Sequence, residues 1–77
     1  MSDVLYVSNN CNGCEIVLSQ LRTWNKSMIQ VRNIDQDADA RATLFRTGRH
    51  AVPTAVIGGH VVTGAYEILG ALRRVYP

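Results

Sequence analysis

The stretch DVLYVSNNCNGCEIVLSQLRTW, residues 3–24, carries the pattern that decides the fold. Its first six residues are rich in β-forming apolar side chains and are followed by Asn9-Asn10, which predicts a buried strand over residues 3–8. From residue 14 the apolar side chains recur at gaps of three, one, three and three, which predicts an amphipathic helix over residues 14–24. Two cysteines, Cys11 and Cys14, lie where the strand gives way to the helix. Their chemistry is therefore expected at the carboxyl end of a strand, where open α/β sheets place their sites.

The rest of the chain predicts five further elements, separated by turn residues. In chain order they are a strand (28–34), a helix (37–47), two short strands (54–57 and 60–63) and a helix that begins near residue 64. Gly58-Gly59 predicts a tight antiparallel hairpin, whereas the helix that joins the first two strands predicts their parallel pairing. The sequence therefore predicts an α/β fold of order β-α-β-α-β-β-α, with a four-stranded mixed sheet and three helices.

The second and third helices carry side chains whose burial and capping can be predicted. Asp35 and Asp37 are candidate N-caps of the helix over residues 37–47, and Gly48 is its expected stop. The side chains expected near one face of that helix are Ala38, Ala42 and Phe45. Those expected to point inward from the last helix are Ile68, Leu69, Leu72 and Val75.

Length and charge exclude several classes of protein. The 77 residues are enough for one small domain, which we expect to cover residues 1–77. The net charge is +2 and the eight basic residues are dispersed apart from Arg73-Arg74, so no nucleic-acid partner is predicted. The apolar run from Val4 to Val7 is too short for a signal peptide or a membrane span. We therefore expect a cytoplasmic monomer with no membrane partner, in a compartment where disulfides are mostly transient or catalytic.

The spacing of the two cysteines indicates redox chemistry. Sulfur atoms separated by two residues at the first turn of a helix reach bonding distance with little backbone movement. Cys11 is expected beside the free N–H groups and partial positive charge of the helix N-terminus, which stabilise a thiolate. Thiol pKa values in such motifs range from ~3.5 to ~7.5. Cys11 is therefore the predicted nucleophile, and the more buried Cys14 is the thiol that resolves the mixed disulfide. Gly13 between them is expected to leave the site more open.

The cysteine pair has two other possible interpretations, a structural disulfide and a metal site. A structural disulfide across two residues removes little entropy from the unfolded chain, so stability explains the pair poorly. A zinc site needs two more ligands, and the spacing of His50 and His60 fits none of the common zinc patterns. Redox chemistry is favoured over a metal site or over two buried cysteines without chemistry, and no metal-ligating residues are predicted.

Further motifs carry a resemblance to a known family. They are Asp35-x-Asp37, Thr47-Gly48, Val52-Pro53, Gly58-Gly59 and Gly64. With Cys11-x-x-Cys14 ahead of them, the chain resembles the glutaredoxin family over most of its length. The resemblance implies a thioredoxin-like fold, Cys11 as nucleophile, Cys14 as resolving thiol and a cis peptide bond before Pro53. Such a bond would present the backbone N–H and C=O of Val52 to a substrate, which could pair there as an added strand.

The resemblance also implies how glutathione would bind. Members that use glutathione hold it partly through a lysine shortly before the first cysteine, and Ser8 stands at that position here. Arg49 is expected to bind a carboxylate, and Gly64 with the Ala65 amide would receive the other at a helix N-terminus. No bound cofactor is expected. Because the lysine is missing, two electron sources stay open: glutathione as co-substrate, or thioredoxin reductase, as in the glutaredoxin-like hydrogen donors of ribonucleotide reductase.

The predicted activity is that of a small dithiol thiol–disulfide oxidoreductase. Its predicted partners are disulfide-containing proteins, glutathione mixed disulfides and one of the two electron sources. The alternative is a binding module, in which Cys11 from two chains would bridge an iron–sulfur cluster together with glutathione.

Overall fold

The computed structural model describes residues 3–24 and 29–76, and the predicted order β-α-β-α-β-β-α is confirmed. The elements are β1 (Asp3–Val7), α1 (Asn12–Trp24), β2 (Ile29–Asn33), α2 (Ala38–Arg46), β3 (Thr54–Ile57), β4 (His60–Thr63) and α3 (Ala65–Val75). Met28, which the predicted second strand included, lies outside the described residues. The helix predicted to start at Cys14 starts two residues earlier, because Asn12 and Gly13 form its first turn.

The sheet is mixed, with the strand order β2-β1-β3-β4. β1 pairs in parallel with β2, and Val7 lies opposite Asn33 where both strands end. β3 pairs antiparallel with β1 and with β4. Since parallel strands end at the same edge of a sheet, the loop after β1 and the loop after β2 leave the sheet side by side.

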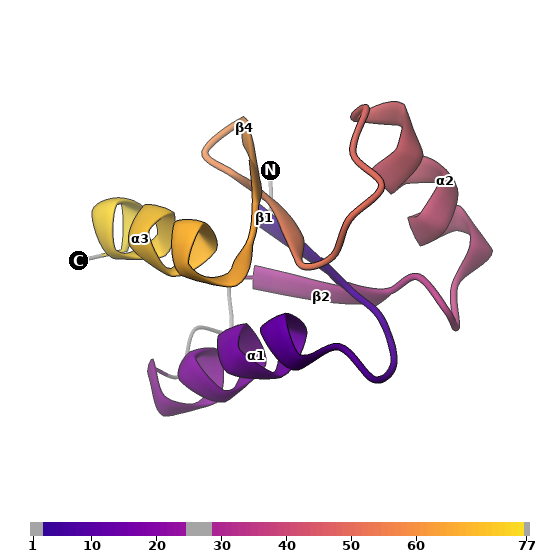
Figure 1. The fold of residues 1–77 in the computed structure, drawn as a ribbon. Helices are drawn as coiled ribbons and strands as arrows, with labels where there is room; N and C mark the ends of the chain where they lie inside the picture. The colour runs from indigo at the N-terminus through magenta and orange to yellow at the C-terminus, as the bar shows by residue number, and fades with distance from the viewer. Residues whose placement is uncertain (1–2, 25–28, 77) are drawn as a thin grey trace.

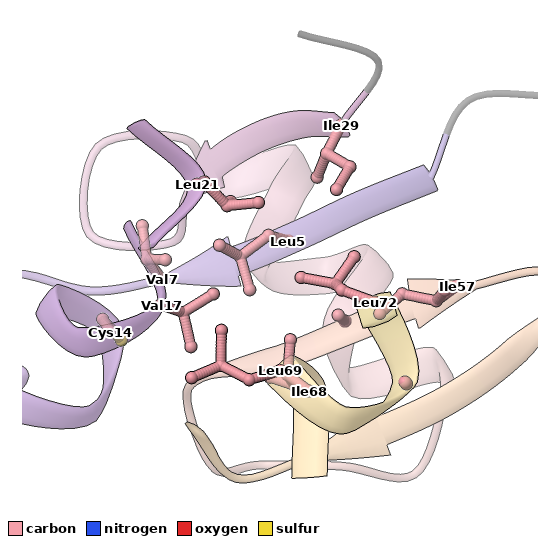
Figure 2. Packing of buried hydrophobic residues seen from close by; sticks show 12 residues of the cluster. Leu5, Val7, Cys14, Val17, Leu21, Ile29, Ile57, Ile68, Leu69 and Leu72 are labelled. Carbon is pink, nitrogen blue, oxygen red and sulfur yellow. The ribbon is translucent and has the colours of Figure 1, made fainter. Parts of the chain in front are cut away.

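The three helices cover the two faces of the sheet unequally (Figure 1). α1 and α3 pack together on one face, and α2 lies alone on the other. Side chains of β1, α1 and α3 point toward one another in the larger core, as Figure 2 shows for Leu5, Val17 and Ile68. The smaller core, beneath α2, consists of Tyr6, Ile34, Ala40 and Leu44. Apolar burial on both faces holds the sheet between its helices.

The buried face of α2 differs from the predicted one. Ala40 and Leu44 are fully buried, whereas Ala38 and Ala42 are exposed and Phe45 is 45% exposed. The prediction was wrong because alanines recur through this helix and leave its orientation open, and the helix packs with Leu44 against Tyr6 and Ile34. Phe45 lies on the outer side against His50, with ring centroids 4.8 Å apart.

The inward face of α3 is confirmed for three of its four predicted members. Ile68, Leu69 and Leu72 are buried, but Val75 is 46% exposed. Val75 is the last residue of the helix. It lies near Gly58 of the hairpin turn, which has no side chain to cover it.

In the described part of the chain, no helix is both long enough and apolar enough to cross a membrane.

Candidate active site

Cys11, the first of the two cysteines, lies in the loop that follows β1. Three residues, 8–10, separate Val7 from Cys11, and Asn10 among them adopts a left-handed backbone conformation with φ 55°. Asparagine is one of the few side chains that tolerates this region. The turn at Asn10 brings the chain back to start α1 at Asn12.

Cys11 caps the N-terminus of α1. Its carbonyl oxygen accepts the N–H of Glu15 at 3.0 Å, and its Sγ accepts the N–H of Cys14 at 3.1 Å. The second bond satisfies one of the N–H groups that the first turn of a helix leaves without a partner. In the reduced protein the same N–H, with the positive end of the helix dipole, can stabilise a thiolate at this sulfur.

The two cysteines form a disulfide, with their Cα atoms 5.2 Å apart. This separation lies within the range of about 4.4–6.8 Å usual for disulfides. Cys14 is only 1% exposed and belongs to the larger core, whereas Cys11 is partly exposed. A partner approaching from solvent therefore meets Cys11 first.

Pro53 and Ala65 approach the motif at Gly13. A Cβ atom at residue 13 would lie 3.0 Å from Pro53 Cδ and 3.8 Å from Ala65 Cβ. The peptide bond between Val52 and Pro53 is cis. Gly13 is predicted from the sequence to leave the site more open, but its lack of a side chain instead allows Pro53 to approach closely.

Thr54 holds the segment before β3 in place. Its side chain is fully buried, and its hydroxyl donates to the carbonyl oxygen of Ala51 at 2.7 Å. The same oxygen lies 2.9 Å from the hydroxyl of Thr63 on β4. The sequence identifies Thr54 as a strand residue that follows Val52-Pro53, and neither feature reveals what its hydroxyl will bind.

The N-terminus of α3 is connected to the same segment. The N–H of Gly64 donates to the carbonyl oxygen of Pro53 at 3.0 Å, and Gly64 adopts φ 101°. Ala65 starts the helix, and its Cβ would lie 3.8 Å from a Cβ atom at residue 13, so the first turns of α1 and α3 are close together. Two helix N-termini, each with a partial positive charge, therefore meet beside the cysteine pair.

The other predicted site residues, Val52 and Arg49, lie in or next to the segment that leads from α2 to Pro53. Val52 is half-buried and packs against both cores, so the backbone at the bond to Pro53 is firmly placed. Arg49 is exposed in the segment between α2 and Pro53, and its backbone N–H donates to Thr47 Oγ1 at 3.3 Å. Arg49 is thus accessible to an anion from solvent.

A ring of hydrogen bonds beside the motif was not predicted. It joins Asn9, in the loop before Cys11, to Asn33 at the end of β2 and to Asp35 in the loop that follows. The sequence predicts Asp35 as a candidate helix cap and as part of the Asp35-x-Asp37 motif, but Asp37 is the residue that caps α2, by accepting the N–H of Ala40 at 3.1 Å. The parallel pairing of the first two strands was the one sequence signal that these two loops would be neighbours.

A metal site is not apparent in the described ranges, which contain no group of three or more His, Cys, Asp or Glu side chains placed to hold an ion. His50, one of the two histidines in the sequence, packs against Phe45.

Comparisons with known proteins agree with this geometry. A family model described as Glutaredoxin matches residues 4–62. The thioredoxin-like protein BC3987 is 28% identical, with a TM-score of 0.78 over 96% of this chain and 99% of its own. The holo form of glutaredoxin C1 from Populus tremula x tremuloides is 26% identical, with a TM-score of 0.69 over 94% of this chain and 74% of its own. The buckwheat glutaredoxin–glutathione complex is 25% identical, with a TM-score of 0.70 over 94% of this chain and 68% of its own. None of the curated proteins matches the sequence. The architecture is thus thioredoxin-like.

Proposed function

Since this chain belongs to the glutaredoxin family and is a thiol–disulfide oxidoreductase, we propose that it reduces protein disulfides and glutathione mixed disulfides through Cys11 and Cys14. The observation that carries the proposal is the linked cysteine pair at the N-terminus of α1, with one sulfur partly exposed and the other buried. We further propose that residues 1–77 act as a single domain and a monomer in the cytoplasm.

The reaction consists of two exchanges. The Cys11 thiolate attacks one sulfur of the substrate disulfide, and that S–S bond breaks as a bond between Cys11 and the substrate forms. The displaced sulfur leaves as a thiolate and takes up a proton. Cys14 then loses its proton and attacks the Cys11 sulfur, which releases the second substrate sulfur as a thiol. Two electrons have passed to the substrate, and Cys11 and Cys14 are left as the disulfide that the structure contains.

We assign substrate binding to the segment beside the pair. The Val52 backbone would pair with an extended substrate, giving affinity with little dependence on its sequence. For a glutathione adduct, Arg49 would bind one carboxylate. Gly64 and the Ala65 N–H would receive the other at the N-terminus of α3, where the dipole favours an anion. The meeting of that helix with α1 at Gly13 supports this assignment.

The electron source follows from which partner can reduce the Cys11–Cys14 disulfide. Glutathione is one candidate, and the buckwheat glutaredoxin of the comparison was solved as its glutathione complex. Thioredoxin reductase is the other, because Ser8 stands where glutathione-using members carry a lysine.

The test is an NADPH-coupled assay with a mixed-disulfide substrate, run with glutathione plus glutathione reductase or with thioredoxin reductase. We expect turnover with at least one system, and loss of turnover in Cys11→Ser. In Cys14→Ser we expect the substrate to remain attached to Cys11, which intact-mass spectrometry detects. Turnover that survives in Cys11→Ser contradicts the proposal.

The iron–sulfur scaffold remains the second candidate. It is favoured by the exposure pattern, because each chain offers one accessible sulfur at Cys11 while Cys14 is buried. Purification without oxygen in the presence of glutathione would give a coloured dimer if the chain holds a cluster. A colourless monomer under those conditions counts against it.

A further inference from the structure

The loop that carries Cys11 is fixed to the loop after β2. The β1–β2 pair ends at Val7 and Asn33, and one more backbone bond, from Ile34 N–H to Val7 O at 2.9 Å, extends it. Beyond that point the two segments of the chain separate, and one leads to Cys11 while the other leads to α2. Only side chains can connect them there.

Three hydrogen bonds close a ring across this gap. The N–H of Asn9 donates to Asp35 Oδ2 at 2.8 Å, and the N–H of Asp35 donates to Asn33 Oδ1 at 2.8 Å. The Nδ2 of Asn33 then donates to Asn9 Oδ1 at 3.0 Å. Asn9 is therefore held at its backbone and at its side chain, two residues before the reactive cysteine.

The ring restrains the turn at Asn10, whose backbone conformation is energetically unfavourable. Asn10, directly after Asn9, is held at φ 55°, a region that non-glycine residues occupy at an energetic cost. The position of Cys11 depends on that turn, and the stabilisation of its sulfur depends on the Cys14 N–H at 3.1 Å. A relaxed turn would move the sulfur away from this donor.

We propose that Asp35 is a positioning residue for Cys11, which acts through Asn9 to keep the sulfur on the N–H groups of α1. The inference rests on the proposed function, in which Cys11 is the nucleophile. The carboxylate has the wrong charge to stabilise a thiolate directly. Its effect through charge and its effect through position therefore have opposite signs, and an experiment can separate them.

The experiment measures alkylation of Cys11 by iodoacetamide across a range of pH, in a Cys14→Ser background so that one thiol reacts. Asp35→Ala removes the acceptor and the charge, whereas Asp35→Asn removes the charge and keeps an oxygen that can accept the Asn9 N–H. At pH 6 we expect Cys11 of Asp35→Ala to be alkylated at least about threefold more slowly than Cys11 of the parent. Only the thiolate reacts, and its fraction falls in this variant. We expect Asp35→Asn to react at least as fast as the parent.

A matched control is Asp39→Ala, which removes the same charge from an exposed position on α2. It should leave the rate unchanged, and circular dichroism should show all variants folded at the assay temperature. The inference is overturned if Asp35→Ala reacts as fast as the parent or faster, or if Asp35→Asn is slowed equally.

The proposed function has a separate point of failure in the same data. If the parent thiol reacts at pH 6 no faster than a free cysteine does, the nucleophile assignment fails whatever Asp35 does. If the parent is reactive and the Asp35 variants do not differ, only the positioning role fails.

Discussion

Gly13 shows how one missing side chain shapes the site. The chain around it comes from three places: the first turn of α1, the cis Val52–Pro53 segment and the start of α3. Because these meet where a Cβ atom would be, the glycine sets how closely Pro53 and Ala65 approach the cysteines.

We expect Gly13→Ala to destabilise the protein, although alanine is the better helix former. The gain in helix propensity is at most about 1 kcal/mol, and forcing a methyl group against a packed proline costs roughly 1–3 kcal/mol. The free energy of unfolding, measured in urea, should therefore fall. Gly70→Ala in α3 is the control, because its Cβ would meet only Arg74 Nη1 at 3.8 Å, and it should be neutral or stabilising. Equal stability of the two variants would contradict this account.

Thr54 offers a second test at the residue scale. Thr54→Val keeps the shape of the side chain but leaves the Ala51 carbonyl and the Thr63 hydroxyl without this partner. Losing a buried hydrogen-bond partner costs about 1–3 kcal/mol. The measurement is chemical unfolding, together with kcat/KM in the coupled assay, which should also fall because Pro53 precedes Thr54. Thr43→Val, which removes a hydroxyl bonded along α2, should cost less.

At the scale of elements, α2 depends on its N-cap. The bond from Ala40 N–H lowers the pKa of Asp37 below its ordinary 3.8, against desolvation, and Arg32, 3.3 Å away, lowers it further. A carboxyl group whose pKa is lowered by folding stabilises the folded state above its ordinary pKa. That contribution is lost as the pH falls through the folded-state value.

Asp37→Ala should therefore reduce the thermal unfolding midpoint at pH 7, and by less as the pH is lowered beneath 3.8. Melting curves of the parent and the variant between pH 7 and pH 2 provide the measurement. A difference that stays constant over this range would show that the charge of Asp37 contributes nothing.

For α2, the position of the helix could be predicted from the sequence but its buried face could not. Its position and ends were predictable from Asp37 and Gly48, since capping is a local property. Its buried face was not, because the choice between Ala42 and Leu44 depends on contacts with Tyr6 and Ile34 that only the assembled sheet provides. In α1, by contrast, Val17 and Leu21 are large, and their spacing alone defines the buried side.

At the scale of the whole molecule, Asp3 connects parts far apart in the sequence. One carboxylate oxygen accepts the N–H of Gly58 at 3.1 Å, and the other accepts a hydrogen bond from the hydroxyl of Tyr76. The first strand, the hairpin turn and the end of the last helix are thereby held together. The bond to Asp3, with desolvation and the nearby negative charge, raises the pKa of Tyr76 above its ordinary 10.0.

This connection predicts a loss of stability in alkali. A group whose pKa is raised by folding contributes fully below its ordinary pKa, and the contribution disappears as the pH rises through the folded-state value. Tyr76→Phe should lower the unfolding midpoint at pH 8, and the difference from the parent should shrink above pH 10. A difference that persists unchanged to pH 12 would contradict it.

The fold was predictable from the sequence because its elements are short, separated by turn residues and marked by strong apolar periodicity. The Cys11–Cys14 pair was predictable from its spacing, and the closeness of Pro53 from the family resemblance. The ring of Asn9, Asn33 and Asp35 was not, since its members are polar residues at the end of β2 and in the loops after β1 and β2. Only the register of β1 against β2 brings those loops into contact.

Because the two sulfurs are unequally buried, only Cys11 of the pair is accessible for thiol–disulfide exchange. In the proposed mechanism a substrate is attached at Cys11 and leaves from that same atom, since Cys14 is enclosed by the core. The protein would therefore hold one covalently attached substrate at a time.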